Sequence, residues 1–255
     1  MPLLSIKDLS IRFGGIVALE DASFEIESAQ IMGLIGPNGA GKTTIFNCIT
    51  RIYHPNSGSI TIDGRDLLRM QPHEVISAGV ARTFQNLELF NSMSVLDNVL
   101  VGLHATMKAT AIEAAFVLPR SRNEERLAKE RAQAVLELLH LQGYAGVPAG
   151  GLPFGVKKRV EMARALAGHP KLLLLDEPAN GLNREEVDEL GAIIRALRND
   201  LNVTVLLVEH HMGLVMAISD RVCVLDFGRK IAEGTPIEIQ NDSRVIAAYL
   251  GEPVA

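Results

Sequence analysis

A glycine-rich segment carries the residue types that bind phosphate. It has the pattern G-x-x-x-x-G-K-[ST], followed by a second threonine, and its members are Gly36, Pro37, Asn38, Gly39, Ala40, Gly41, Lys42, Thr43 and Thr44. Glycines let the backbone wrap closely around a phosphate, in conformations that a side chain would block. The freed N–H groups and the N-terminus of a following helix supply positive potential. The segment is therefore predicted to bind the phosphates of a nucleotide.

Three side chains of this segment have expected partners. Lys42 is predicted to reach the β- and γ-phosphates, the Thr43 hydroxyl to bind Mg²⁺, and Thr44 to bond an earlier phosphate. The surroundings support this prediction, because the short apolar run 30–35 predicts a buried strand that leads directly into the loop. Residues 42–50 contain no Gly or Pro and predict a helix. A chance glycine-rich turn rarely has both neighbours.

A second segment ends in two carboxylates. The apolar run 172–175 is followed by Asp176, Glu177 and Pro178. A strand of this kind brings its last residues to the carboxyl edge of a sheet, where open α/β folds bind ligands. Asp176 suits the Mg²⁺ shell through water, and Glu177 can act as general base toward the attacking water. Alone, the pair is explained equally well as a strand meeting solvent, but with the phosphate loop it predicts nucleotide hydrolysis.

The elements that must position these residues alternate between strands and helices. In the first part, alternating apolar residues predict strands at 4–13, 22–26 and 59–62. Beyond Gly151 the expected helices are 156–168, 184–198 and 237–250, and the expected strands are 172–175, 203–208, 221–225 and 230–232. Alternation of this kind implies a parallel sheet with right-handed crossovers. We expect an α/β phosphate-loop NTPase core, a mostly parallel sheet flanked by helices, with an N-terminal antiparallel β part.

The middle of the chain differs in composition from both sides. Ala, Leu and Glu dominate from about residue 95 to 144, and β-branched residues become sparse after Val101. Ser121 or Asn123 can cap a helix whose apolar face comes from Leu127, Val135, Leu138 and Leu139. We expect a helical subdomain at 95–150, inserted between the core segments 1–94 and 151–255, within a single domain that spans 1–255.

Composition excludes several classes of protein. The chain has 255 residues, a formal charge of −5 and 47% hydrophobic residues, enough for one large core or a core with a small subdomain. The acidic balance argues against a nucleic-acid partner.

Cys48 and Cys223 match no metal or redox spacing, so we expect them to be small buried residues and the protein to lie in a reducing, cytosolic compartment. No signal-peptide pattern and no apolar run of roughly 18 residues appears, so we expect a soluble protein.

Further segments resemble the ATP-binding cassette family, and the resemblance covers Leu4 to about Gly251. The segment in place of the family's L-S-G-G-Q signature is Leu152, Pro153, Phe154 and Gly155, with the signature helix after it. Gln85 resembles the glutamine loop, 179–183 the dimer-facing loop and His210 the switch histidine. Phe13 lies where the family stacks an aromatic ring on adenine. Each feature alone has a plainer explanation, but their order and spacing together make coincidence improbable.

The resemblance implies an ATPase that holds ATP and Mg²⁺ between two subunits, identical or paralogous. One subunit supplies the catalytic and metal-binding residues Lys42, Thr43, Gln85, Asp176, Glu177 and His210, with Thr43, Gln85 and Asp176 at the metal. The other subunit supplies the signature segment, whose helix N-terminus faces the γ-phosphate. ATP then favours the closed dimer, and hydrolysis loosens it.

Several residues depart from the family pattern. Pro153 replaces the signature serine and removes a hydroxyl, Phe154 replaces a glycine, and Val156 replaces a glutamine. Asn183 and His211 stand where aspartates are common. Gly155 and the start of the helix remain, so the dipole contribution of the signature helix is retained. We expect these changes to tune the rate of hydrolysis without removing the base, the metal ligands or the lysine.

Within the family, the chain resembles the larger ATPase subunit of branched-chain amino acid importers. The resemblance to this importer subgroup lies in the proline and aromatic before Gly155, and in the segments 181–183, 208–210, 218–221 and 245–252. The longish helical region from about 102 to 150 resembles the larger of the importer's two ATPase subunits. It implies a membrane permease pair, a solute-binding protein reached indirectly, and a peripheral position on the inner face of the cell membrane. Candidate permease contacts are 86–90 and Met93. Related subunits serve urea, short amides or lipopolysaccharide export, so the solute stays open.

Three other classes compete with a transporter subunit. A cassette ATPase acting on DNA, chromosomes or ribosomes usually carries coiled-coil insertions, zinc sites or two cassettes, and none is recognisable in the sequence. A phosphate-loop GTPase is expected to carry an [NT]-K-x-D segment, which we do not find. A phosphate-loop kinase stays an alternative, and an assay with nucleoside or protein acceptors would test it. A regulatory subunit with an inactive site is disfavoured by Lys42, Asp176, Glu177 and His210.

Overall fold

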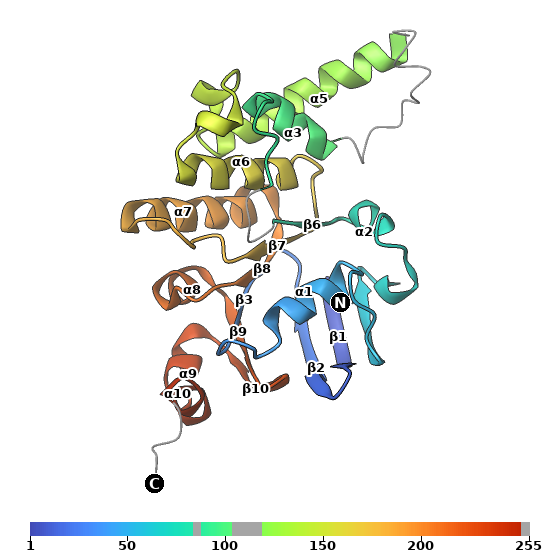
Figure 1. The fold of residues 1–255 in the computed structure, drawn as a ribbon, viewed down its shortest axis with the longest axis vertical. Coiled ribbons are helices and arrows are strands. Elements are labelled where there is room, and N and C mark those ends of the chain that lie inside the picture. Colours follow the sequence, from blue (N-terminus) through green and yellow to red (C-terminus); the bar gives the residue numbers. More distant parts are fainter. Residues whose placement is uncertain (84–87, 104–118, 251–255) are drawn as a thin grey trace. The chain divides into compact units, whose positions relative to one another are not determined.

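The structure, a computed structural model, describes residues 1–83, 88–103 and 119–250, except for the side chains of 119–123 and 250. The chain forms two compact units, one of Met1–Arg82 with Lys171–Ala255 and the other of Thr83–Pro170 (Figure 1). The predicted helical segment 95–150 falls inside the second unit, which also contains the helix after the signature segment. The division into core and signature subdomain stays a prediction.

One sheet of the first unit is antiparallel, with the strand order β2-β1-β4-β5. Its strands are β1 (Leu4–Phe13), β2 (Ile16–Ile26), β4 (Ser57–Ile62) and β5 (Arg65–Asp66). The predicted N-terminal antiparallel β part is therefore confirmed, although β2 begins well before Ala22. Inward-facing side chains such as Leu4, Ile6 and Leu9 are fully buried, so this sheet contributes one wall of the core.

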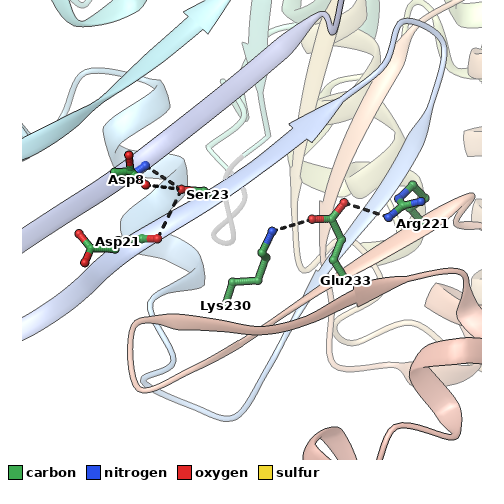
Figure 2. A network of polar contacts seen from close by, with 6 residues as sticks. All are labelled: Asp8, Asp21, Ser23, Arg221, Lys230 and Glu233. Carbon is green, nitrogen blue, oxygen red and sulfur yellow. Dashed lines mark hydrogen bonds and ion pairs between the residues drawn. The ribbon is translucent and has the colours of Figure 1, made fainter.

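Serine–aspartate pairs stabilise two irregularities in the β1–β2 ladder. Asp8 and Asp21 both have φ of 50°, and the register shifts on either side of Leu9. The Ser23 hydroxyl accepts a hydrogen bond from the Asp8 N–H at 2.7 Å and donates to the Asp8 carboxylate at 3.1 Å (Figure 2). Ser10 makes the same two contacts with Asp21, both at 2.9 Å. Because aspartate tolerates the left-handed conformation, these bulges do not require glycine.

The second sheet has the order β10-β9-β3-β8-β7-β6. Its strands are β3 (Ile31–Ile35), β6 (Val80–Arg82), β7 (Leu172–Asp176), β8 (Thr204–Val208), β9 (Arg221–Asp226) and β10 (Arg229–Gly234). All neighbouring pairs are parallel except the β9–β10 hairpin, where Glu233 forms ion pairs with Lys230 and Arg221 (Figure 2). β3, β7 and β8 are buried along their whole length, as continuous apolar runs in a parallel sheet predict.

Helices accompany the parallel strands in the first unit and make up most of the described part of the second. Those of the first unit are α1 (Lys42–Ile49), η1 (Leu67–Arg69), α2 (Glu74–Ser77), α7 (Arg184–Leu201), α8 (Met212–Ile218), α9 (Pro236–Gln240) and α10 (Ser243–Leu250). Those of the second unit are α3 (Val95–Leu103), α5 (Pro119–Leu138), η3 (Gln142–Tyr144), η4 (Ala149–Gly151) and α6 (Phe154–Leu166). None of the described helices combines the length and apolar character needed to cross a membrane.

The prediction of a single helix over 237–250 is wrong. The chain leaves the helical path after α9 and starts α10 anew. The Asn241 side chain donates to the Ile237 carbonyl oxygen at 2.8 Å, and the Asp242 carboxylate accepts from the Arg244 N–H at 2.8 Å. Short polar side chains that bond nearby backbone groups compete with helical hydrogen bonds, so Asn241 and Asp242 divide the helix.

The main core of the first unit includes both cysteines. Phe46 of α1 is its largest fully buried side chain, and Cys48 and Cys223 are buried in the same cluster. Burial raises the pKa of the Cys48 thiol to about 11 and that of Cys223 to about 12. The expectation that the cysteines are small buried residues is therefore confirmed.

Candidate nucleotide-binding and hydrolysis site

The phosphate loop lies between the carboxyl end of β3 and the N-terminus of α1. Gly36 has φ of 149° and Gly41 φ of 101°. A Cβ atom on Gly36 would lie 2.1 Å from the Leu225 carbonyl oxygen, and one on Gly41 would lie 2.8 Å from that of Ala18. Both positions therefore require glycine, for conformation and for space. Gly41 is the N-cap of α1, so the first N–H groups of the helix have no partner within it.

Lys42 folds back over the loop. Its Nζ donates hydrogen bonds to the carbonyl oxygens of Gly36 at 2.7 Å and Pro37 at 2.9 Å, and the residue is almost completely buried. Burial lowers the pKa of Lys42, and the carboxylates of Glu177 and Asp176 partly offset that effect. The ammonium group thus lies inside the curve of the loop and within the field of both acidic residues. Thr43 and Thr44 follow it in the first turn of α1.

Asp176, the last residue of β7, forms a buried ion pair with Arg82. The Arg82 guanidinium lies 2.8 Å from the Asp176 carboxylate, donates to the Asn47 side-chain oxygen at 2.7 Å, and stands 5.4 Å from the centre of the Phe46 ring. Arg82 ends β6, which pairs with β7 in parallel. Sequence reasoning missed Arg82, because its partner is 94 residues away. Only the register of the two strands places it beside the acidic pair.

Glu177 and His210 lie side by side although they are far apart in sequence. The Nε2 atom of His210 is 3.1 Å from Oε1 of Glu177. The Glu177 N–H donates to the Val208 carbonyl oxygen at 2.8 Å, and Glu177 has φ of 48°. A left-handed residue at a strand end turns the chain sharply, so the Glu177 side chain leaves the sheet edge toward the loop that carries His210. The structure thus brings together the two residues that were predicted as base and switch.

Sequence reasoning also missed the role of Glu209, which follows β8. Its side chain is buried, with Oε1 accepting from the Ala179 N–H at 2.6 Å and Oε2 accepting from the N–H groups of His210 and His211 at 3.0 and 3.1 Å. The only signal in the sequence is an acidic residue directly after an apolar strand, which solvent exposure would explain equally well.

The remaining predicted residues lie at other places. Phe13, at the end of β1, is exposed, so it is not a core residue. Its ring makes an edge-to-face contact with the Tyr53 ring, with 4.9 Å between the ring centres. The signature segment belongs to the second compact unit, where Leu152 is buried and Pro153 is the N-cap of α6. Gln85, which was predicted as a catalytic and metal-binding residue, lies outside the described residues.

The residue set fits a magnesium nucleotide. Among the described residues no three His, Cys, Asp or Glu side chains cluster as a self-contained metal site. Mg²⁺ is typically held by one or two protein oxygens together with phosphates and water, and Thr43 and Asp176 can supply such oxygens. Gly36 and Gly41 have positive φ angles and closely packed protein neighbours that exclude a side chain, so they fix a loop conformation whose backbone N–H groups can bind phosphate.

Comparison with known proteins identifies the family. A family model described as "ABC transporter" matches residues 19–180, which include the phosphate loop and the acidic pair. The chain belongs to the ABC transporter family. It is an ATPase of the ATP-binding cassette kind, as the resemblance predicted. A second model, described as "Branched-chain amino acid ATP-binding cassette transporter", matches residues 229–255.

Curated relatives of this cassette extend the match to nearly the whole chain. The high-affinity branched-chain amino acid transport ATP-binding protein BraF of Pseudomonas aeruginosa is 44% identical, covering 98% of both chains. The corresponding protein LivG of Escherichia coli is 43% identical over the same shares. The lipopolysaccharide export system ATP-binding protein LptB of Escherichia coli is 34% identical, covering 99% of this chain and 98% of that protein.

Solved cassettes share the fold. A nucleotide-free ATP-binding cassette from an ABC transporter has a TM-score of 0.85 and 29% identity, covering 99% of this chain and 100% of that one. Another ATP-binding cassette of an ABC transporter, in its ADP conformation, has a TM-score of 0.86 and 30% identity over the same shares. The predicted fold class is therefore confirmed.

Two departures of this cassette from the family pattern have a structural explanation. Asn183 is the N-cap of α7, where its side chain accepts from the Glu186 N–H at 3.0 Å and Glu186 accepts from the Asn183 N–H at 2.9 Å. His211 is the N-cap of α8, where its Nδ1 accepts from the Leu214 N–H at 3.1 Å. Aspartate is also a preferred N-cap residue, so Asn183 and His211 keep the capping function of the usual side chain.

Proposed function

We propose that this cassette is the ATP-hydrolysing subunit of an importer of branched-chain amino acids. It works as a dimer of cassettes, peripheral on the cytoplasmic face of a membrane permease, and a solute-binding protein outside the membrane delivers the solute to that permease. Support comes from the relatives named for branched-chain amino acid transport, which match nearly the whole chain, and from the C-terminal family model. The contact that carries the proposed chemistry is the 3.1 Å approach of His210 to Glu177.

In this proposal the first step is binding of MgATP. Lys42 and the N–H groups of the phosphate loop bind the β- and γ-phosphates, while Thr43 and Asp176 hold Mg²⁺. When bound, Mg²⁺ neutralises negative charge on the phosphate oxygens. Gln85 is proposed as a further metal ligand from its position in the sequence. Phe13, exposed at the end of β1, is proposed to contact the adenine ring.

The second step is attack by water on the γ-phosphorus, which forms a bond from the water oxygen to that phosphorus, breaks its bond to the β-phosphate oxygen, and leaves ADP and phosphate. The Glu177 carboxylate accepts the proton of the attacking water as general base. His210 holds that carboxylate in place through its ring nitrogen. Arg82 pairs with the Asp176 carboxylate and would hold that carboxylate where it can bind Mg²⁺. The partner subunit supplies the signature segment 152–155, whose helix N-terminus stabilises charge on the γ-phosphate.

The base is tested with Glu177→Gln, which retains the shape of the side chain. The variant should keep ATP binding, lower turnover by about 10²–10⁴-fold, and accumulate as an ATP-bound dimer in size-exclusion chromatography with MgATP. Glu27→Gln, an exposed residue of the same unit, is the matched control and should behave as wild type. Turnover at the wild-type level in Glu177→Gln would remove Glu177 from the role of base.

The transport assignment needs a separate experiment. Detergent-solubilised membranes from the native host should yield a permease pair and a partner cassette when the tagged chain is pulled down. Vesicles that contain this complex and its solute-binding protein should take up leucine, isoleucine or valine with ATP hydrolysis, and Glu177→Gln should abolish the uptake. Uptake of urea or a short amide alone, or co-purification with a lipopolysaccharide-export complex, would contradict the proposed solute while leaving the ATPase intact.

A further inference from the structure

One buried carboxylate joins the two loops that carry the proposed base and switch. Glu209 is only 3% exposed, and both of its oxygens accept hydrogen bonds from backbone N–H groups. Oε1 accepts from Ala179, which belongs to the loop after the acidic pair, while Oε2 accepts from His210 and His211. The loop after β7 and the loop after β8 therefore share one side chain as their common acceptor.

The same two loops meet at two further places. The end of β7 pairs with the end of β8, Asp176 opposite Val208, and the Glu177 N–H donates to the Val208 carbonyl oxygen. His210 then approaches Glu177 at 3.1 Å. The side chain of His210 is 43% exposed, so packing alone does not hold the ring. The ring takes its position from its own backbone, and Glu209 bonds that backbone.

A carboxylate suits this position better than any neutral side chain. It offers two acceptor oxygens and no donor, which matches N–H groups arriving from both sides. A glutamine of the same shape offers one acceptor and one NH₂ donor. In one orientation its NH₂ group faces the Ala179 N–H, and in the other it faces those of His210 and His211. In the first orientation the buried Ala179 N–H group loses its acceptor, and in the second the part-buried N–H groups of His210 and His211 lose theirs, so one loop loses its bond to residue 209.

We propose that Glu209 is a positioning residue for ATP hydrolysis. It fixes the backbone of His210 relative to the loop that begins at Ala179, and thereby sets the distance between the His210 ring and the Glu177 carboxylate. Glu209 does not touch the nucleotide and transfers no proton. The inference rests on the proposed roles of Glu177 and His210, so its test includes variants of both.

The test is steady-state ATP hydrolysis by the purified full chain with Mg²⁺. Glu209→Gln should lower kcat by about tenfold to hundredfold, because small displacements of a catalytic group have effects of this size, while KM for ATP stays within about twofold. His210→Ala should also lower kcat. Because Glu209 acts through His210, adding Glu209→Gln to His210→Ala should lower kcat by less than about twofold more.

The matched control is Thr204→Val at the opposite end of β8. Thr204 is fully buried, and its hydroxyl accepts one part-buried hydrogen bond from the Ala29 N–H at 2.9 Å, so the variant also removes the acceptor of a backbone N–H group. Its kcat should equal that of wild type. An equal fall in kcat for Thr204→Val would show that general destabilisation explains the Glu209 result, and would overturn the proposal.

Two further results would overturn the proposal: wild-type kcat in Glu209→Gln, or effects of Glu209→Gln and His210→Ala that multiply in the double variant. If Glu209→Gln does not fold, Glu209→Asp carries the same comparison with His210→Ala, because it retains two acceptor oxygens on a shorter stem. Wild-type turnover in both Glu177→Gln and His210→Ala is a different result, since it contradicts the proposed function itself.

Discussion

The guanidinium group of Arg82 lies 2.8 Å from the carboxylate of Asp176, and both side chains are almost completely buried. The pair joins β6 to β7, next to the phosphate loop, and Arg82 also bonds Asn47 of α1. Asp176 is thus held by a side chain that no local pattern in the sequence indicated.

Arg82→Met should destabilise the chain, because it leaves the Asp176 carboxylate buried without its cation. A loss of about 3–5 kcal/mol is expected when one partner of a buried ion pair is removed. Urea unfolding measures this loss of stability. Mg²⁺-dependent binding of ATP should also become weaker. Arg69→Met is the control, because Arg69 forms an exposed pair with Asp66 that is worth at most about 1 kcal/mol. Equal stability of the two variants would contradict the structural role of Arg82.

Gly36→Ala should weaken nucleotide binding. The added methyl group would lie 2.1 Å from the Leu225 carbonyl oxygen, so the loop or β9 must move. Titration with a fluorescent ATP analogue should show at least about a tenfold loss of affinity, which corresponds to about 1.4 kcal/mol. Gly64 also has a positive φ, of 73°, but the methyl group of Gly64→Ala would meet no atom within 4 Å. That control should bind the analogue normally, and a normal affinity in Gly36→Ala would refute the steric argument.

His211→Ala should lose the N-cap of α8, whereas His211→Asp should keep it. The loss of an N-cap side chain costs about 1 kcal/mol. For a chain of this size, 1 kcal/mol corresponds to a fall in Tm of about 2–4 °C. Thermal unfolding followed by circular dichroism should therefore place His211→Asp close to wild type and His211→Ala below both. The same Tm in the alanine and aspartate variants would mean that the 3.1 Å contact to Leu214 does not stabilise α8.

Phe90→Ala should uncouple ATP hydrolysis from transport. Phe90 is 50% exposed, and its neighbour Leu89 is half-buried, which suits contact with a permease, whereas Leu87 lies outside the described residues. In reconstituted vesicles, Leu87→Ala/Phe90→Ala and Phe90→Ala alone should hydrolyse ATP without the usual stimulation by the permease. Ile237→Ala, an exposed apolar residue of α9, is the control and should be stimulated normally. Unchanged stimulation in both Phe90 variants would contradict the docking role.

The two thiols should react slowly in the native protein. Because burial raises the pKa of Cys48 to about 11 and that of Cys223 to about 12, both thiols are almost fully protonated at pH 8. Only the thiolate is nucleophilic, so alkylation by iodoacetamide should be slow at pH 8 and should accelerate in urea. Mass spectrometry measures the labelled fraction at each site. Rapid labelling of either cysteine in the folded protein would show that its surroundings open readily.

Motif chemistry and the element pattern could be predicted from local sequence. The glycine-rich segment, the acidic pair and their flanking strands are short contiguous patterns, and each has a local physical meaning. The buried runs of β3, β7 and β8 are apolar from end to end, so they predict a covered parallel sheet without any knowledge of partners. Helix ends that depend on a few side-chain hydrogen bonds were harder to predict, as the break between α9 and α10 at Asn241 and Asp242 shows.

The sequence by itself predicted which residues bind phosphate and determined where strands and helices alternate, because those properties depend on residues close together in the chain. Only the tertiary structure decided that Arg82 pairs with Asp176, that His210 contacts Glu177, and that Glu209 joins their two loops. Each of these contacts depends on the register of parallel strands that are distant in sequence. A charged residue after an apolar strand has the same local pattern whether it meets water or a buried partner. Only the folded structure therefore distinguishes a solvent-exposed charge from a buried, paired one.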